Sequence, residues 1–186
     1  MFAALSGVLG TASLVWGRVW MINGPDHPRE LDSLPQLLQF EQPGDATMTV
    51  LDLPAWVRFL AAAPGLAQAL MLAAAAFLLM RVLIEIADGR SFGAEVQRGL
   101  GRIGWLLVVG SFIVLALDVL ALWRIEVEIW AFADAVRNDG GVTSTGIGTE
   151  LPRILWLPLA LGFVAFALRW AFKDGARLEK DAEGVI

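Results

Sequence analysis

The stretch Phe59–Met80 contains 22 consecutive residues without a charge and is bracketed by Arg58 and Arg81. At about 1.5 Å per helical residue it is roughly 33 Å long, enough to cross the ~30 Å hydrocarbon core of a bilayer. This length predicts a membrane-spanning helix, which the flanking residues extend to about 56–86. Three other apolar runs, at about 2–22, 103–123 and 154–172, predict three further spans. The expected fold is therefore an all-α membrane protein with four transmembrane helices in a single domain over residues 1–186.

Composition supports this fold class and excludes several kinds of chemistry. The 186 residues are 57% hydrophobic and their mean hydropathy is +0.64, which is too apolar for a soluble domain. Cysteine is absent, which excludes disulfides, thiolate metal sites and a cysteine nucleophile. A single histidine, His27, excludes bis-histidine haem and histidine-rich metal sites, so neither a cofactor nor a metal is predicted. The formal charge of −5 argues against nucleic acid as a partner.

The first apolar run is expected to be retained as a span, since its only basic residue, Arg18, comes late and Trp20 and Met21 follow. A signal peptide would instead have a basic start and a small-x-small cleavage site. Small residues recur along one face of this helix, where another helix can approach closely. They are Ala3, Ser6, Gly7, Gly10, Ser13 and Gly17.

Two long polar connections, residues 23–55 and 124–153, separate the spans and can carry short β-strands. In the first, frequent prolines predict a loop with one short helical turn at Leu34–Phe40, and Thr47–Leu51 is prone to form a strand. In the second, Ile125, Val127 and Ile129 alternate with charged residues. This alternation has the period of a strand, yet a helix continuing through the same residues is equally consistent with it.

The remaining polar segments are a short loop, 87–102, and a charged tail, 173–186. Within the loop, Phe92, Val96 and Leu100 recur every four residues, which predicts an amphipathic helix lying at the membrane surface before the third span.

Basic residues predict the orientation, because cytoplasmic segments near span ends carry the excess of Lys and Arg. The short loop and the end of the chain together hold eight: Arg81, Arg90, Arg98, Arg102, Arg169, Lys173, Arg177 and Lys180. The other side holds six, Arg18, Arg29, Arg58, Arg124, Arg137 and Arg153, beside eleven acidic residues. Both termini are therefore expected in the cytoplasm and both long connections outside, in a multi-pass protein of the cell (inner) membrane.

Two segments on the expected cytoplasmic side carry a family resemblance. The sequence Gly89-Arg90-Ser91-Phe92, followed by Glu95-Val96-Gln97-Arg98 and Arg102-Ile103-Gly104-Trp105, resembles the signature of the DUF2975 family of bacterial membrane proteins. The ending from Phe172 to Ile186 is similar to that family's C-terminal pattern, although Glu95 stands where the family usually has asparagine. The resemblance implies a four-helix integral membrane protein of uncharacterised function with no known catalytic residue.

Charged residues inside the spans are the first candidates for a special role. Arg18 and Asp118 lie at matching depths near the outer ends of the first and third spans. Because a lone charge in hydrocarbon is costly, we predict an ion pair between them that holds two helices together, in preference to a proton or ion relay. Gln68, near the middle of the second span, is expected to hydrogen-bond a neighbouring helix rather than to line a pore.

A second candidate is a cytoplasmic interaction surface that contains both signs of charge. Its proposed members are Arg90, Phe92, Glu95, Arg98, Arg102 and Arg177. Contact with membrane lipids and mutual salt bridges would explain these residues, and docking of a protein partner is the functional alternative.

No nucleophile–base pair, metal cluster or phosphate-binding loop can be assembled from the sequence, so an enzyme is not predicted. The predicted role is that of a non-enzymatic accessory or regulatory component that binds another protein. The alternative is a homo-oligomeric channel or transporter subunit, since four short spans leave little room for a pathway within one chain.

Overall fold

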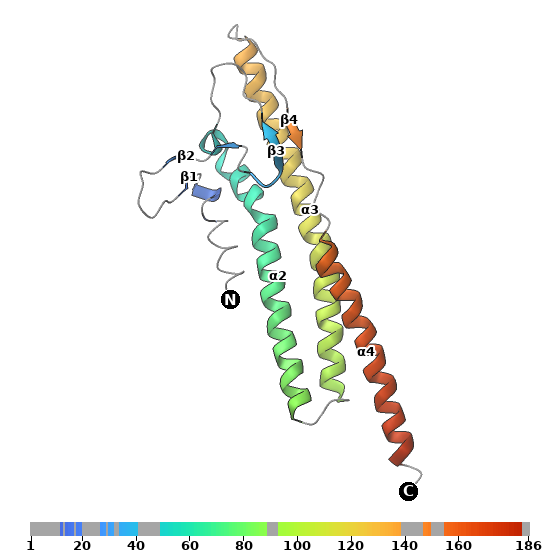
Figure 1. Cartoon of the computed structure of the whole chain (residues 1–186). Helices are drawn as coiled ribbons and strands as arrows, with labels where there is room; N and C mark the ends of the chain where they lie inside the picture. Colours follow the sequence, from blue (N-terminus) through green and yellow to red (C-terminus); the bar gives the residue numbers. More distant parts are fainter. Residues whose placement is uncertain are drawn as a thin grey trace. The chain divides into compact units, whose positions relative to one another are not determined.

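The structure is a computed structural model of the chain. It describes residues 12, 14–16, 18–19, 27–28, 30–31, 34–40, 49–88, 93–138, 147–149 and 155–183. Three long helices account for most of them: α2 (Ala55–Ala87), α3 (Ala94–Asn138) and α4 (Trp156–Glu183) (Figure 1). Each is long and apolar enough to cross a bilayer, which confirms the helices predicted over 56–86, 103–123 and 154–172. The chain is therefore a helical membrane protein with three candidate spans among the described residues, and most of the predicted span 2–22 lies outside them.

Large apolar side chains are exposed along all three helices. Phe59 on α2, Trp105 on α3 and Phe163 on α4 are each 60–61% exposed. Contiguous apolar surface of this kind is unfavourable in water and favourable against lipid tails. The exposed surface therefore agrees with the membrane assignment drawn from helix length.

The described chain divides into two compact units, and α2 and α3 each contribute to both. The first, which we call the bundle unit, contains described residues 68–88, 93–113 and 155–183. The second, which we call the connection unit, contains the described residues up to 67 and those from 114 to 149.

Glycines of α3 fix its packing against α2 in the bundle unit. A Cβ atom added at Gly99 would strike Val82 of α2, and one added at Gly110 would strike Met71. A step of eleven residues forward along α3 thus corresponds to a step of eleven residues back along α2. The two helices are antiparallel and approach closely because these positions lack a side chain.

Close approach at glycine positions also joins α3 to α4. A Cβ atom at Gly104 would lie 2.9 Å from Phe166 Cε1, and one at Gly162 would lie 2.8 Å from Val108 Cγ2. The later α3 residue, Val108, lies opposite the earlier α4 residue, Gly162, so α4 is antiparallel to α3. In the bundle unit α3 is therefore the central helix, with glycine contacts to both neighbours.

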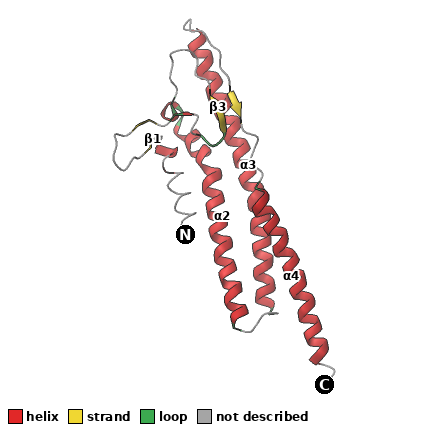
Figure 2. Cartoon of the chain, viewed as in Figure 1, coloured by secondary structure: helices red, strands yellow, loops and turns green. Residues whose placement is uncertain are grey.

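Four short strands belong to the connection unit and form two antiparallel pairs (Figure 2). Strand β1 (Arg18–Val19) pairs with β2 (His27–Pro28). Strand β3 (Leu37–Phe40) pairs with β4 (Ile147–Thr149), with a register irregularity between Leu37 and Gln39. Since β3 precedes α2 and β4 follows α3, the two long connections meet at the same end of these helices. The expectation that the connections carry short strands is thereby met.

A tight turn before β3 directs three leucines inward. The Leu34 N–H donates to the Leu31 carbonyl at 3.0 Å, and the Leu37 N–H donates to the Leu34 carbonyl at 3.1 Å. Bonds between residues three apart have 3₁₀ geometry, in which such residues share one side. All three leucines are accordingly buried.

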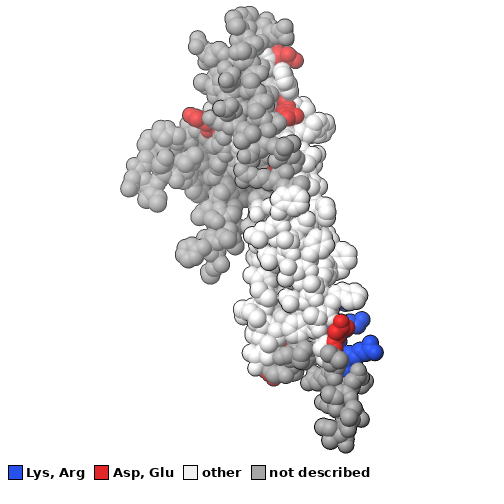
Figure 3. All heavy atoms as spheres, turned by 45° about the vertical axis from the view of Figure 1, so that its right-hand side comes forward, with Lys and Arg blue, Asp and Glu red and all other residues white. Residues whose placement is uncertain are grey.

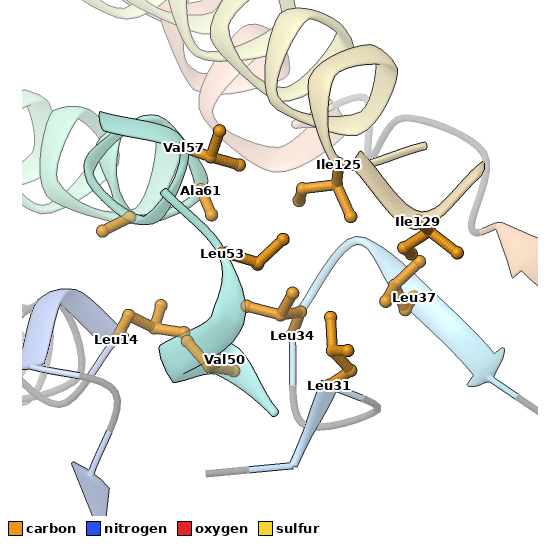
Figure 4. Close-up of a cluster of buried hydrophobic side chains, with 11 residues drawn as sticks. Leu14, Leu31, Leu34, Leu37, Val50, Leu53, Val57, Ala61, Ile125 and Ile129 are labelled. Atoms are coloured by element: carbon orange, nitrogen blue, oxygen red, sulfur yellow. The ribbon is translucent and has the colours of Figure 1, made fainter. Parts of the chain in front are cut away.

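These leucines belong to the hydrophobic core of the connection unit (Figure 4). Its other members are Leu14, Val50 and Leu53, together with Val57, Ala61 and Ala62 of α2 and Ile125 and Ile129 of α3. Val50 and Leu53 are positioned by the 3₁₀ turn Val50–Asp52, whose Asp52 carboxylate accepts hydrogen bonds from the Thr49 N–H and hydroxyl group. The core thus joins the first connection to the ends of α2 and α3.

The question of strand or helix over 124–136 is answered by α3, which continues without interruption to Asn138. Ile125 and Ile129 are fully buried, whereas Val127 between them is exposed. Burial at every fourth residue is the period of a helix face, since a strand would bury all three on one side.

Four other local expectations are wrong. Val50 and Leu51, expected in a strand over Thr47–Leu51, belong to the 3₁₀ turn Val50–Asp52. Leu37–Phe40 is a strand rather than a helical turn, because it pairs with β4 from the distant second connection. Residues 94–102 are not a separate surface helix: Val96 and Leu100 continue a buried stripe of α3 through Ile103 and Leu107. The chain at Arg18–Val19, expected to be helical within the first span, is strand β1.

Candidate functional site

The predicted cytoplasmic surface is described in part. Arg90 and Phe92 lie outside the described residues, whereas Glu95, Arg98 and Arg102 lie on the first turns of α3. Glu95 Oε1 and Arg98 Nη2 form an ion pair of 3.0 Å on the exposed helix surface. Arg177 is exposed on α4, and in the described part of the chain no ion pair joins it to the members on α3.

A pocket of about 350 Å³ lies between α2 and α3 in the bundle unit. Its described lining is Leu78, Arg81, Val82, Ile84 and Glu85 from α2, with Glu95, Gly99 and Arg102 from α3. On α3 these residues follow a spacing of four and three, which places them on one helix face. Arg81 and Glu85 were not among the predicted site residues, although their four-residue spacing from each other and their position next to the loop 87–102 are visible in the sequence.

Charges in this pocket are sorted along the helix axes. Val82 lies opposite Gly99, so Arg102, three residues further along α3, lies at the level of residue 79 of α2. Glu95 lies in the other direction, level with residue 86. The two arginines are thus nearer the apolar part of the helices, and the two glutamates are nearer the turn that joins α2 to α3.

Aromatic rings accompany the basic side chains at this end of the bundle unit. The Arg81 guanidinium lies 5.7 Å from the centre of the Phe77 ring, and Lys173 Nζ lies 5.8 Å from that of Trp170. Trp105 packs edge-on against Phe166, with ring centres 5.7 Å apart. Cations beside aromatic rings are typical of the depth where a span meets the lipid headgroups.

A similar group marks the opposite ends of the apolar segments, within the connection unit. The Arg124 guanidinium lies 5.1 Å from the centre of the Trp56 ring and 4.7 Å from that of Trp123. Because α2 and α3 are joined here by one guanidinium, their apolar segments end at the same level. Tryptophan rings are typical of the depth where a span meets the lipid headgroups.

Asp118, the predicted partner of Arg18, interacts with a residue that the sequence did not suggest. Gln36, which is only 3% exposed, donates from Nε2 to Asp118 Oδ1 at 3.3 Å and to the Ala61 carbonyl oxygen at 3.1 Å. Pro64 has no N–H for the carbonyl of Leu60, so Gln36 reaches α2 where its ladder of hydrogen bonds is interrupted. The Arg18 side chain lies outside the described residues, so the Arg18–Asp118 ion pair stays a prediction.

We expect Gln36→Met to destabilise the connection unit by about 1–3 kcal/mol, because it keeps the volume but removes the hydrogen bonds to the buried Ala61 carbonyl and to the partly buried Asp118 carboxylate. Hydrogen exchange of residues 57–65 would measure the loss. In a double-mutant cycle, Gln36→Met and Asp118→Ala should be coupled by at least about 0.5 kcal/mol. Coupling of Asp118 to Arg18→Ala instead would identify the predicted ion pair as the dominant contact.

Among the described residues no group of three His, Asp or Glu side chains could hold a metal ion. What the charged pocket offers instead is a pair of guanidinium groups, which bind anions well. Searches of protein-family models, curated proteins and solved structures find no match to this chain. The resemblance to the DUF2975 family stays a prediction.

Proposed function

We propose that this chain is a four-span protein of the cell (inner) membrane with both termini in the cytoplasm, and that it serves as a non-enzymatic accessory or regulatory component that binds another protein. The pairing of β3 with β4 supports this topology, because it requires both long connections to lie on one side. The excess of basic residues at the short loop and the C-terminal segment supports a cytoplasmic location for the other side.

The observation that carries the proposal is the length of α4. The helix does not end with its apolar segment at Phe172 but continues to Glu183, roughly 16 Å further. Lys173, Asp174 and Arg177 are exposed on this extension. Figure 3 shows charges of both signs here, next to a surface without charged side chains.

A helical extension of mixed charge suits recognition of a protein more than anchoring to lipid. Anchoring to anionic lipid would favour basic residues alone. The extension instead carries Asp174 beside Lys173 and Arg177, and such alternation selects a partner with a complementary pattern.

The channel alternative needs polar side chains at mid-membrane depth that face a shared axis. Among the described residues of the spans, the Ser111 hydroxyl donates to the Leu107 carbonyl of its own helix at 2.7 Å, and Gln68 is half-buried. These two side chains give no specific support to a water-filled axis shared by several copies, so we propose partner binding.

Purification in mild detergent is expected to give a particle heavier than the 20.1 kDa chain by one partner at fixed stoichiometry. Arg177→Glu should reduce the recovered partner by about tenfold, since it replaces attraction by like-charge repulsion at a contact. Quantitative mass spectrometry of the purified particle measures both results. Asp134→Lys, an equally large charge change at an exposed position of the connection unit, should leave recovery unchanged.

Because the chain has no cysteine, the orientation can be checked with the same two positions. In intact cells a membrane-impermeant maleimide should label Asp134→Cys, and it should reach Arg177→Cys only after permeabilisation. Labelling of Arg177→Cys from outside would refute the cytoplasmic location. A particle that contains only copies of this chain would contradict partner binding and favour the oligomeric alternative.

A further inference from the structure

We propose that the pocket between α2 and α3 in the bundle unit binds the phosphodiester headgroup of an anionic phospholipid, with Arg81 and Arg102 as the groups that contact the phosphate. This inference concerns lipid recognition and does not depend on the protein partner proposed above. It uses only residues of the bundle unit, whose mutual positions are given by the glycine contacts of α3.

The first argument is the availability of positive charge. Glu95 is already engaged by Arg98, which lies outside the described lining, at 3.0 Å. Within the described chain, the Arg102 guanidinium has neither an ion pair nor a hydrogen bond. Arg81 lies over Phe77, and a ring contact of this kind orients a cation without neutralising it. Two guanidinium groups therefore line the pocket at positions where an anion can reach them.

The second argument is the order of the charges along the pocket. The arginines lie nearer the apolar segments and the glutamates nearer the α2–α3 turn. A phospholipid presents its phosphate next to its acyl chains and any cationic or hydroxyl group further out. The arrangement therefore matches the order of groups in a lipid headgroup as it lies at the membrane boundary.

The third argument is the surface beside the arginines. Ile84 in the lining is half exposed, and two further apolar side chains are exposed near the arginines: Met80, beside Arg81 on α2, and Trp105, three residues after Arg102 on α3. Acyl chains can follow these side chains while the phosphate occupies the pocket. A free inorganic anion would gain nothing from this apolar border, which favours a lipid as the ligand.

The fourth argument is the size of the pocket. A volume of about 350 Å³ is at the lower end of the range for sites that hold a small molecule. It accommodates a headgroup but not the whole of a lipid. The close contact between Gly99 and Val82 holds the two helices together at the pocket and keeps the guanidinium groups on either side of it.

The test uses the full-length protein, stripped of lipid in detergent, and compares phosphatidylglycerol with phosphatidylcholine. Native mass spectrometry should show one retained phosphatidylglycerol, and this lipid should raise the melting temperature more than phosphatidylcholine does. The double variant Arg81→Gln/Arg102→Gln should bind phosphatidylglycerol at least about tenfold more weakly. The matched control, Lys173→Gln/Arg177→Gln, removes the same charge from α4, outside the described pocket lining, and should stay within about twofold of wild type.

Three results would overturn the proposal. The first is equal binding of phosphatidylglycerol by the double variant and wild type, and the second is an equal loss in the matched control, which would indicate a general effect of surface charge. Inorganic phosphate and glycerol phosphate are added separately, and the third is stabilisation by either of them equal to that by the lipid, which would indicate a free-anion site in place of a lipid site. If the double variant does not elute as a single folded species, Arg102→Gln and Arg102→Lys replace it, and the lysine variant should retain more binding than the glutamine variant.

Discussion

Leu53→Ala is expected to lower the free energy of unfolding of the connection unit by about 2–5 kcal/mol, the usual cost of truncating a buried leucine. Leu53 is 2% exposed and lies between the ends of α2 and α3, among the buried side chains shown in Figure 4. Loss of its side chain removes apolar contacts and leaves a cavity that the two long helices are too rigid to close. Hydrogen exchange of residues 49–61 and 125–133 in the purified protein would measure the change in opening free energy.

The chain provides a matched control two residues away. Leu51 is 39% exposed on the same 3₁₀ turn, so Leu51→Ala deletes the same atoms from a position that remains in contact with solvent. Its effect should be within about 0.5 kcal/mol. Similar losses for both variants would mean that the turn itself, rather than burial of Leu53, determines the stability of the connection unit.

Gly162→Val is expected to destabilise the packing of α4 against α3 by about 1–3 kcal/mol. A Cβ atom at Gly162 would lie 2.8 Å from Val108 Cγ2 and 3.2 Å from the carbonyl oxygen of Gly104. The second contact is with backbone, which cannot move aside as a flexible side chain does, so α4 must shift as a whole. Thermal unfolding in detergent should show a lower midpoint, and cysteine crosslinking between α3 and α4 should become slower.

Gly65 on α2 is the control for this substitution. A Cβ atom there would meet nothing within 4 Å, so Gly65→Ala should be neutral or stabilising by up to about 1 kcal/mol, the gain in helix propensity. Equal destabilisation by Gly65→Ala and Gly162→Val would show that these glycines serve helix flexibility rather than close approach.

Properties that depend on one segment alone were predictable from the sequence. The uncharged run Phe59–Met80 has the length of a span wherever it packs, and it lies within a single helix. The charged boundaries near Arg58 and Arg124 could be read in the same way, because aromatic and basic residues favour that depth irrespective of the fold. A local pattern is sufficient for such properties.

Contacts between distant segments were not predictable in this way. The residues of β3 have no pattern that identifies β4 as their partner, so a helical turn was expected there. For Asp118, the charges inside the spans suggest Arg18 as a partner, whereas the donor found among the described residues, Gln36, belongs to the segment before α2. In residues 125–129 the alternation of isoleucine and valine fits both periods, and only burial of every fourth side chain separates helix from strand.

The α3 side of the candidate pocket could be predicted from the sequence, and the α2 side could not. Its α3 residues Glu95 and Arg102 were expected to belong to a functional surface, because charged positions stand out next to a span. The contribution of Arg81 and Glu85 depends on which face of α2 meets α3, and that is determined by Gly99 and Gly110. Glycine marks where helices can approach, but the sequence does not say which helix fills the space.

The composition of the connection unit has a consequence for how the protein is made. Leu31, Leu34 and Leu53 leave the ribosome well before Ile125 and Ile129, the residues that cover them. Until α3 has been inserted beside α2, these leucines lack the two isoleucines that help to bury them. The core of this unit can therefore be completed only after synthesis has passed residue 129, and the segment before α2 stays incompletely buried for that interval.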